Sequence, residues 1–199
     1  MEAGADLIER VRLVCGTRHV LTDPVALLTY RSDGVRRDGP LPLAVALPGD
    51  GAEVAGVVSA CADNQVPWVV RGAGTSRDGS ALPTSAGLLI ALTRMRRVLA
   101  IELADDEVTV QAGVPAATLA RSLAPTHTLA IDYPGTVGGA AAAGMLGRHL
   151  VGLDLVQPDG TLVSCTPRSI GYDLSGAFGG SHGTRGIAVS LTLRAVPFS

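Results

Sequence analysis

The sequence predicts an α+β protein made of two small lobes that divide after about residue 92. Residues 43–70 read as a strand, an amphipathic helix and a second strand, a β-α-β unit that favours a parallel pair. Residues 98–114 alternate around two aspartates, which is typical of a hairpin. Residues 150–165 hold two apolar runs about a Pro-Asp-Gly turn. A chain of 199 residues suffices for one sizeable domain or two such lobes with a real core.

The individual elements follow from local patterns along the chain. The first helix rests on apolar residues at helical spacing over 7–14, and Asp23-Pro24 can begin a second, short helix. The helix of the β-α-β unit places apolar residues of 54–61 on one face. Pro115 begins a further helix over 115–124. The expected strands are residues 43–48, 66–70, 87–92, 98–103 and 107–114, two within 150–165, and a last one over 186–196.

Composition excludes several partners. The net charge is −2, with arginines and carboxylates interspersed, and only six aromatic residues are available for stacking, so we expect no nucleic-acid partner. Apolar residues make up 47% but occur in runs far below the roughly 20 that span a bilayer, so we expect no membrane span. The first residues are acidic and lack the basic region of a secretory signal. We therefore expect a cytoplasmic protein.

The chain contains no lysine, and all 16 basic residues are arginine. A Walker-type phosphate loop, a pyridoxal enzyme and a protein kinase each require a lysine, so these mechanisms are excluded. The cysteines, Cys15, Cys61 and Cys165, are odd in number and far apart. This spacing fits neither a disulfide framework nor a metal site, and it predicts buried free thiols.

Three glycine-rich segments, at 71–79, 132–144 and 171–187, are the candidates for ligand binding. Glycines remove side chains where a ligand could approach the backbone, and consecutive exposed N–H groups form an anion nest that suits a pyrophosphate. The spacing is not the Rossmann fingerprint. A loop that merely turns the chain is the alternative for any one segment. Three together favour an extended dinucleotide, if they converge.

A rival motif, Gly-Gly-Ser-His-Gly at 179–183, matches the nucleophile elbow of hydrolases. Such a serine needs an acid and then a histidine later in the chain, but only the adjacent His182 follows Ser181, and no aspartate or glutamate does. We interpret this motif as a tight turn. The acidic residues at 105–107 read as a solvated hairpin tip, because nothing there would bury them and shift a pKa.

Five ordered segments also carry a family resemblance over nearly the whole chain. They are VLTDPVALLTYRSDG (20–34), LAVALPGDGAEVAGVVSACADNQVPWVVRGAGTS (43–76), GLLIALTRMRRVLAIELADDEVTVQAGVPAATLARSLAP (87–125), TVGG (136–139) and GYDLSGAFGGSHGTRGIAVSLTLRAVP (171–197). These segments resemble the FAD-binding domain shared by vanillyl-alcohol oxidase, p-cresol methylhydroxylase and the flavin subunits of glycolate oxidase. The resemblance implies a two-lobed FAD-binding domain of the p-cresol methylhydroxylase type. Its small N-terminal α/β lobe would be residues 1–92, and its larger lobe, 93–199, would hold a mixed or antiparallel sheet with flanking helices.

The resemblance also implies a site for FAD. The first loop would wrap the pyrophosphate through its backbone, the second would lie along the ribityl and pyrophosphate region, and the third would place backbone against the flavin or adenine end. The implied residues are Arg71, Gly72, Ala73, Gly74, Thr75, Ser76, Gly79, Pro134, Thr136, Val137, Gly138, Gly139, Gly183, Gly186 and Ile187. Some members tether flavin through a histidine in the first loop, but Thr75 and Ser76 stand there, so we expect non-covalent binding.

Side chains elsewhere receive plainer interpretations from the same comparison. We expect His127, His149 and His182 to be surface or structural residues. Tyr172 and Asp173 match a family motif and are expected to be structural near the flavin. Asp132 and Tyr133, at the start of the second loop, are interpreted as a turn cap, with a ligand contact as the alternative. No catalytic residue or metal ligand is assigned.

The chain departs from the family pattern at three places. Arg77 and Asp78 stand where relatives commonly have a small or apolar residue and a serine. After Gly144, relatives continue through a longer segment that helps to cover the flavin, but this chain has a shortened loop that leads almost at once into residues 145–156. Beyond residue 199, relatives continue into a cap domain that carries most catalytic side chains. The chain is then a separate flavin subunit completed by a partner, a truncated or engineered cofactor module, or a relative with a non-redox use.

Two functions follow as hypotheses. The first is an FAD-dependent oxidoreductase domain or subunit that dehydrogenates a small 2-hydroxy acid such as glycolate or lactate, with a cap-bearing or electron-transfer subunit as a further partner. The second is a binding module that keeps the fold without redox activity and has lost FAD with the shortened loop. Uptake of FAD by the purified protein distinguishes them.

Overall fold

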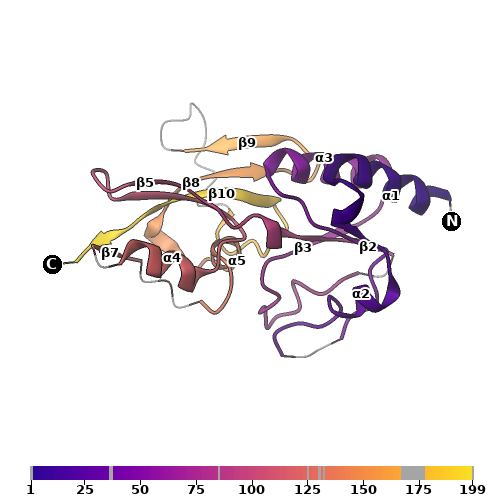
Figure 1. The fold of residues 1–199 in the computed structure, drawn as a ribbon, viewed down its shortest axis with the longest axis horizontal. Helices are drawn as coiled ribbons and strands as arrows, with labels where there is room; N and C mark the ends of the chain where they lie inside the picture. Colours follow the sequence, from indigo (N-terminus) through magenta and orange to yellow (C-terminus); the bar gives the residue numbers. More distant parts are fainter. Residues whose placement is uncertain are drawn as a thin grey trace.

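The computed structural model describes residues 2–35, 38–84, 86–124, 126–129, 131, 133–166 and 178–198. Two β-sheets lie side by side along the long axis of the molecule, and the two termini lie at opposite ends (Figure 1). The smaller sheet uses strands from the first half of the chain, and the larger sheet uses strands from residue 98 onward. The α+β class expected from the sequence is therefore confirmed.

The smaller sheet has the strand order β1-β2-β4-β3. Its strands are β1 (Val20–Leu21), β2 (Ala44–Ala46), β3 (Trp68–Arg71) and β4 (Leu88–Ala91). The expected β-α-β unit is present and its strands run parallel, but they do not pair with each other. β4 lies between them, and its Leu89 is opposite both Val45 of β2 and Val69 of β3. All four residues of β4 are buried, which suits the central position of a parallel sheet covered on both faces.

Helices α1 (Glu2–Cys15) and α3 (Gly51–Asp63) pack against each other, and α2 (Pro24–Leu28) lies on the other side of the smaller sheet (Figure 1). α3 begins at Asp50, whose carboxylate accepts a hydrogen bond from the N–H of Glu53 at 2.9 Å. The expected apolar face of α3 is buried. The same helix also contacts three strands of the larger sheet, so it joins the two halves of the molecule.

The larger sheet has the order β5-β6-β10-β8-β9, and all its neighbouring strands are antiparallel. The strands are β5 (Val98–Glu102), β6 (Glu107–Gln111), β8 (Leu150–Val156), β9 (Leu162–Cys165) and β10 (Ile187–Arg194). The expected hairpin β5–β6 and the strand pair β8–β9 about the Pro-Asp-Gly turn are both confirmed. β10, the last long strand, lies in the centre because it brings buried residues to both neighbours.

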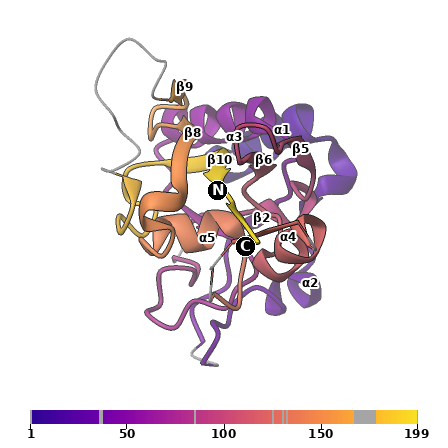
Figure 2. The same cartoon turned by 90° about the vertical axis from the view of Figure 1, so that its left-hand side faces the viewer.

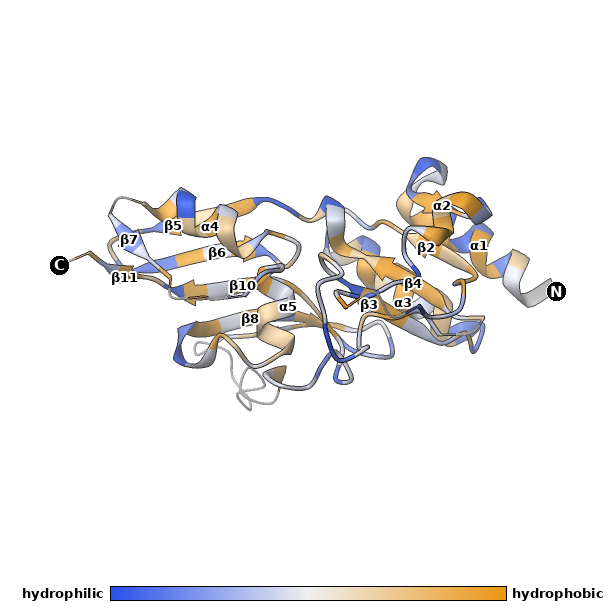
Figure 3. Cartoon of the chain, turned by 90° about the horizontal axis from the view of Figure 1, so that it is seen from below, coloured by the Kyte–Doolittle hydropathy of each residue, from blue (hydrophilic) through white to orange (hydrophobic). Residues whose placement is uncertain are grey.

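Helices α4 (Ala116–Leu123) and α5 (Val137–Ala142) cover one face of the larger sheet (Figures 2 and 3). Pro115 stands at the N-cap of α4, as its position in the sequence predicts. A short two-stranded sheet pairs β7 with β11 near the C-terminus. The remaining elements are β7 (His127–Thr128), β11 (Val196–Pro197) and the 3₁₀ turns η1 (Thr17–His19), η2 (Leu92–Arg94) and η3 (Gly147–His149).

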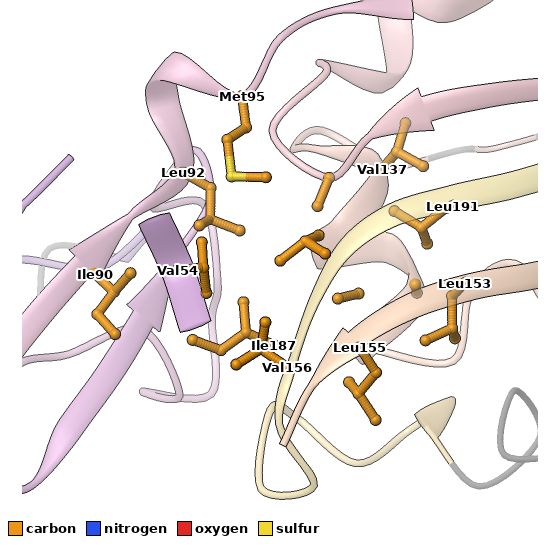
Figure 4. Packing of buried hydrophobic residues seen from close by; sticks show 14 of the residues in the cluster. Val54, Ile90, Leu92, Met95, Val137, Leu153, Leu155, Val156, Ile187 and Leu191 are labelled. Atoms are coloured by element: carbon orange, nitrogen blue, oxygen red, sulfur yellow. The ribbon is translucent and has the colours of Figure 1, made fainter. Parts of the chain in front are cut away.

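One hydrophobic core runs through both sheets. Figure 4 shows Ile90 and Leu92 from the smaller sheet and its following turn, facing Val156 and Ile187 of the larger one, with Val54 of α3 beside them. The three cysteines are buried and free, as expected. Within the described ranges, no helix has the length and apolar character that crossing a bilayer requires.

Candidate functional site

The three glycine-rich segments converge on one cavity, where the end of β3 meets α5 and the start of β10. Its volume of about 520 Å³ is in the range of ~300–1,000 Å³ that is usual for ligand and cofactor sites. Most of the site residues implied by the resemblance line it. They are Gly72, Ala73, Gly74, Thr75, Ser76, Pro134, Thr136, Gly138, Gly139, Gly183, Gly186 and Ile187.

The first loop leaves β3 at Arg71 and folds around the side chain of that residue. The guanidinium donates to the carbonyl oxygens of Tyr30 at 3.4 Å and Ala81 at 3.3 Å. A Cβ on Gly74 would collide with this guanidinium, and Gly74 also has φ +73°. Burial lowers the pKa of Arg71, although the group stays a cation at neutral pH. Arg71 thus shapes the loop from beneath instead of lining the cavity.

Backbone N–H groups of the first loop are free to bind an anion. Within the described part of the chain, the N–H groups of Ala73, Gly74 and Thr75 have no hydrogen-bond acceptor. Consecutive unpaired N–H groups around a residue with positive φ form an anion nest, and the Arg71 cation lies directly behind it. This part of the cavity therefore favours a phosphate or pyrophosphate group.

The first and second loops meet because two glycines have no side chains. A Cβ on Gly72 would collide with the hydroxyl of Thr136. A Cβ on Gly135 would lie 2.7 Å from the Thr75 hydroxyl oxygen and 2.6 Å from a ring carbon of Tyr133. These glycines are thus required by contacts within the protein, and they set the width of the cavity between the loops.

The N-terminus of α5 is used within the protein. Val137 and Gly138 donate their N–H groups to the carbonyl oxygens of Val114 and Ala112, each at 2.8 Å. The N–H of Gly139 donates to the Thr136 hydroxyl at 3.2 Å. The second loop therefore contributes close backbone and small side chains to the cavity wall, while the unpaired donors belong to the first loop.

The third segment reaches the cavity through residues 178–188. The N–H of His182 donates to the carbonyl oxygen of Ala142 at 3.0 Å, which ties this segment to the end of α5. Gly183 packs against Val70 of β3, and a Cβ on Gly186 would collide with the carbonyl oxygen of Val156. Close approach of the backbone to β3 and β8 thus brings the start of β10 into the cavity wall.

Three of the implied residues do not line the cavity. The Arg71 side chain lies behind the loop, Gly79 forms a turn with φ +88°, and Val137 is fully buried in the core. Tyr172, Asp173 and Asp132 lie outside the described residues. Their expected roles stay predictions.

Two further side chains in the cavity wall, Asp78 and His182, contact each other. Asp78 and His182 come from different loops, and Asp78 Oδ2 lies 2.8 Å from His182 Nδ1. His182 is about half exposed, in agreement with the expectation of a surface or structural residue, and it also lies in the cavity wall. A histidine inside a glycine-rich segment was the available signal. Met145 and Phe178, to which no role was assigned from the sequence, also line the cavity, and so does Tyr133, for which a ligand contact was the alternative to a turn cap.

The other two histidines have structural partners, as expected. His127 is buried, with Nε2 at 3.1 Å from a carboxylate oxygen of Asp106 and Nδ1 at 3.1 Å from the Thr126 hydroxyl. His149 Nδ1 lies 3.0 Å from the carbonyl oxygen of Arg194. Asp106 at the hairpin tip is therefore not only solvated but also contacts β7, the strand that pairs with β11.

The pKa values of two groups in the cavity, Asp78 and Tyr133, are shifted, and Asp78 stays negatively charged at neutral pH. Hydrogen bonds from Ser76 and Ser80 hold the pKa of Asp78 well below its usual range. Burial, together with the Asp78 charge, raises the pKa of Tyr133, so its hydroxyl stays protonated. Among the described residues, no group of histidine, cysteine and carboxylate side chains is arranged to hold a metal ion.

The tight turn expected at Ser181 is present. The N–H of Ser181 donates to the carbonyl oxygen of Phe178 at 3.0 Å, and the N–H of Thr184 donates to that of Ser181 at 3.0 Å. The Ser181 hydroxyl has no hydrogen-bond partner among the described residues. Among the residues that the structure describes, no base contacts this hydroxyl to activate it as a nucleophile.

Fold and cavity together define a domain built to bind an extended, phosphate-bearing cofactor between a glycine-rich nest and a second sheet. The chain belongs to the FAD binding domain family, whose family model matches residues 42–166. The residues present fit this cofactor, since a pyrophosphate suits the unpaired N–H groups and the glycine-lined walls leave room for its two arms.

Known relatives share this domain over nearly the whole chain. An uncharacterized FAD-linked oxidoreductase of Mycobacterium tuberculosis (strain H37Rv) is 30% identical over 212 residues, covering 97% of this chain and 46% of the relative. Glycolate oxidase subunit GlcD of Escherichia coli (strain K12) is 30% identical over 189 residues, covering 86% and 38% respectively. The chain thus spans less than half the length of these curated relatives.

The fold is shared with solved enzyme structures. p-Cresol methylhydroxylase with substrate bound superimposes with a TM-score of 0.81 at 19% identity, covering 99% of this chain and 44% of that one. The p-cresol methylhydroxylase type of fold that the sequence implied is therefore confirmed.

Proposed function

We propose that the cavity binds FAD non-covalently, with the pyrophosphate on the N–H groups of Ala73, Gly74 and Thr75. The observation that carries this proposal is the set of unpaired donors at a glycine with positive φ, backed by the Arg71 cation. Non-covalent binding is supported by the lining. All three cysteines are buried outside the cavity, and Nδ1 of His182 is held by Asp78.

The described residues would hold the cofactor chiefly through backbone and shape. Bound FAD supplies a hydride acceptor, and the isoalloxazine carries the redox chemistry. Gly72, Gly138 and Gly139 keep the walls close and free of side chains, which excludes water from the dinucleotide. Ile187 and Phe178, both buried, offer apolar surface to a ring system.

We infer that the chain serves an oxidoreductase acting on a small 2-hydroxy acid. The support is the relationship to a glycolate oxidase subunit over 86% of this chain. The substrate site would be completed by a cap-bearing region or a partner subunit, because the curated relatives are more than twice as long as the region matched. Catalytic side chains are not assigned within the described residues.

The decisive test is flavin binding by the purified protein. FAD added to the apo protein should be retained on a desalting column, give a yellow fraction, and be released intact by denaturation. In a labelled sample, the amide signals of Ala73, Gly74 and Thr75 should shift with FAD or with pyrophosphate alone, while those of α4 should not.

A colourless protein that fails to take up added FAD would contradict the cofactor proposal. Flavin that stays with the denatured chain would contradict non-covalent binding. With FAD bound, reduction by glycolate or D-lactate under anaerobic conditions, with and without a candidate partner subunit, tests the substrate class.

A further inference from the structure

The cavity wall contains a side-chain pair that joins two segments distant in sequence and is ionic when the imidazole is protonated. Asp78 belongs to the first loop and His182 to the third, and Oδ2 and Nδ1 are 2.8 Å apart. Both side chains are about half exposed, at 47% and 49%. The third loop is also held by the contact of Gly183 with Val70 of β3 and by the hydrogen bond from the N–H of His182 to Ala142 of α5. The Asp78–His182 contact is thus a direct side-chain link between the first and third loops.

Asp78 is firmly oriented by its own loop. Its Oδ1 accepts a hydrogen bond from the N–H of Ser80 at 2.9 Å and another from the hydroxyl of Ser76. The Ser76 and Ser80 hydroxyls are 3.0 Å apart and complete a small polar cluster. With Oδ1 engaged in the turn, Oδ2 is the oxygen left for the partner loop. Hydrogen bonding keeps the pKa of Asp78 low, so its charge persists at neutral pH.

His182 is held in a left-handed backbone conformation. Its φ is +50°, in the left-handed region that few side chains adopt, and Gly183 follows with φ +82°. Turn hydrogen bonds on both sides, from Ser181 to Phe178 and from Gly186 to Gly183, support this conformation. The turn therefore presents the imidazole to Asp78.

We propose that Asp78 and His182 form a clasp that holds the third loop against the first across the FAD cavity and slows release of the cofactor. Only the second part of this inference, the slower release of the cofactor, rests on the proposed FAD function. An unpaired Asp78 carboxylate would face the pyrophosphate nest two residues after Ser76, where like charges repel. Because Oδ2 contacts His182, the carboxylate instead links the first loop to the third. Asp78 and His182 are positioning residues, acting through the loops.

Limited proteolysis of the apo protein tests the clasp without any cofactor. Trypsin can cleave after Arg185, which is exposed within the third loop, and the fragment beginning at Gly186 reports that cut. Asp78→Asn keeps an acceptor for the Ser80 N–H but loses the charge that His182 faces. It should increase the rate of this cut about two- to fivefold, the range set by an exposed ion pair. The cut after Arg121 in α4 should be unchanged.

His182→Asn gives the second variant, because asparagine tolerates the left-handed conformation but is too short to reach Asp78. It should open the loop as much as Asp78→Asn, and the double variant should open it no more than either one. Asp159→Asn is the matched control, since Asp159 is an exposed aspartate that accepts from the Thr161 N–H in the β8–β9 turn. Additive effects of the two variants, or no effect of either, would overturn the clasp.

FAD release is the second readout. After dilution of the FAD-loaded protein, recovery of free-flavin fluorescence should be about two- to fivefold faster in His182→Asn and in Asp78→Asn, with no further gain in the double variant. Equal release rates in wild type and variants would overturn the role in cofactor retention. Failure of the wild-type protein to bind FAD would count against the proposed function alone, since the proteolysis experiment judges the clasp separately.

Discussion

At the scale of single residues, the cavity depends on glycines for two separate reasons. Gly74 and Gly183 adopt positive φ, which other residues rarely tolerate. Gly72 does not, and its requirement is space, because the hydroxyl of Thr136 occupies the place of a Cβ. Thr136 is only 6% exposed, and its hydroxyl accepts a hydrogen bond from the N–H of Gly139. It therefore has little freedom to move away. A glycine-rich motif therefore does not by itself mean that a ligand touches every glycine.

Gly72→Ala should separate the first and second loops. We expect the free energy of unfolding of the apo protein to fall by about 1–3 kcal/mol, the usual cost of forcing an extra carbon into a packed site. FAD affinity should fall as well, because the nest would shift relative to the cavity. Urea denaturation and FAD titration measure the two effects.

Gly4→Ala in α1 is the control for this substitution. Its Cβ would meet the methyl groups of Leu43 at 3.5–3.6 Å, an ordinary contact. Alanine in a helix interior is favoured over glycine, so stability should stay the same or rise by up to about 1 kcal/mol. Equal losses in both variants would contradict the steric explanation for Gly72.

The buried thiols should be unreactive in the native protein. Burial raises the pKa of Cys61 from its ordinary value of 9.0 to about 12, and burial, with Glu53 nearby, raises that of Cys15 to about 12. Thiolate is the reactive form, so a disulfide reagent at pH 8 should label these thiols only after denaturation. Rapid labelling of Cys61 in the folded state would show that α3 opens locally.

The same shifts predict how stability depends on pH. A thiol whose pKa is about 12 when folded and near 9.0 when unfolded favours folding below pH 9, and this contribution is lost as the pH rises from 9 to 12. Each thiol should lower the free energy of unfolding by roughly 1.4 kcal/mol per pH unit in that window. Urea midpoints between pH 8 and 11 measure the slope, which should be shallower in Cys61→Ala.

At the scale of elements, α3 is the structural centre because it packs on α1 and on strands of both sheets. Its N-terminus is secured by Asp50, while Glu53 accepts from the N–H of Gly49 at 2.8 Å and pairs with Arg94 at 3.0 Å. Arg94 also donates to the carbonyl oxygen of Leu47 at 2.6 Å. These contacts hold the turn that follows β4 against the start of the helix.

Asp50→Ala should lower the free energy of unfolding by about 0.5–2 kcal/mol, because the N–H of Glu53 loses its cap. Asp63→Ala at the other end of α3 is the matched control. Asp63 forms an exposed ion pair with Arg10, and a carboxylate is unfavourable at a helix C-terminus, so its removal should change little. Comparable losses at both ends would argue against the capping role of Asp50.

At the scale of the whole molecule, we propose that the two lobes unfold together, because a single core passes through both sheets. Trp68, the sole tryptophan, begins β3 in the smaller sheet, while Leu191 is fully buried in β10 of the larger one. Leu191→Ala should cost about 2–5 kcal/mol. The loss should shift the Trp68 fluorescence transition and the circular dichroism transition to the same lower urea concentration.

Leu162→Ala on edge strand β9 is the control, since Leu162 is 48% exposed and should contribute far less. If Leu191→Ala moved the circular dichroism transition but left the Trp68 transition in place, the lobes would be independent units.

Much of the fold could be predicted because the patterns that indicate its helices and strands lie within short segments of the sequence. Helical spacing identified α1 and α3, alternation identified β5 and β6, and the Pro-Asp-Gly turn set the β8–β9 pair. The pairing of β2 with β3 was wrong, because adjacent strands in sequence do not encode which later strand inserts between them. Only burial on both faces selects β4 for that position.

The candidate site likewise has features that the sequence predicted and features that only the tertiary structure decided. The resemblance of five ordered segments indicated the FAD binding domain family, and the glycine-rich segments indicated the loops that line the cavity. The tertiary structure alone decided that Arg71 lies behind the nest, that the N-terminus of α5 is already bonded, and that Asp78 meets His182. Each of these depends on a contact between segments far apart in sequence, and such contacts arise from packing that no local pattern records.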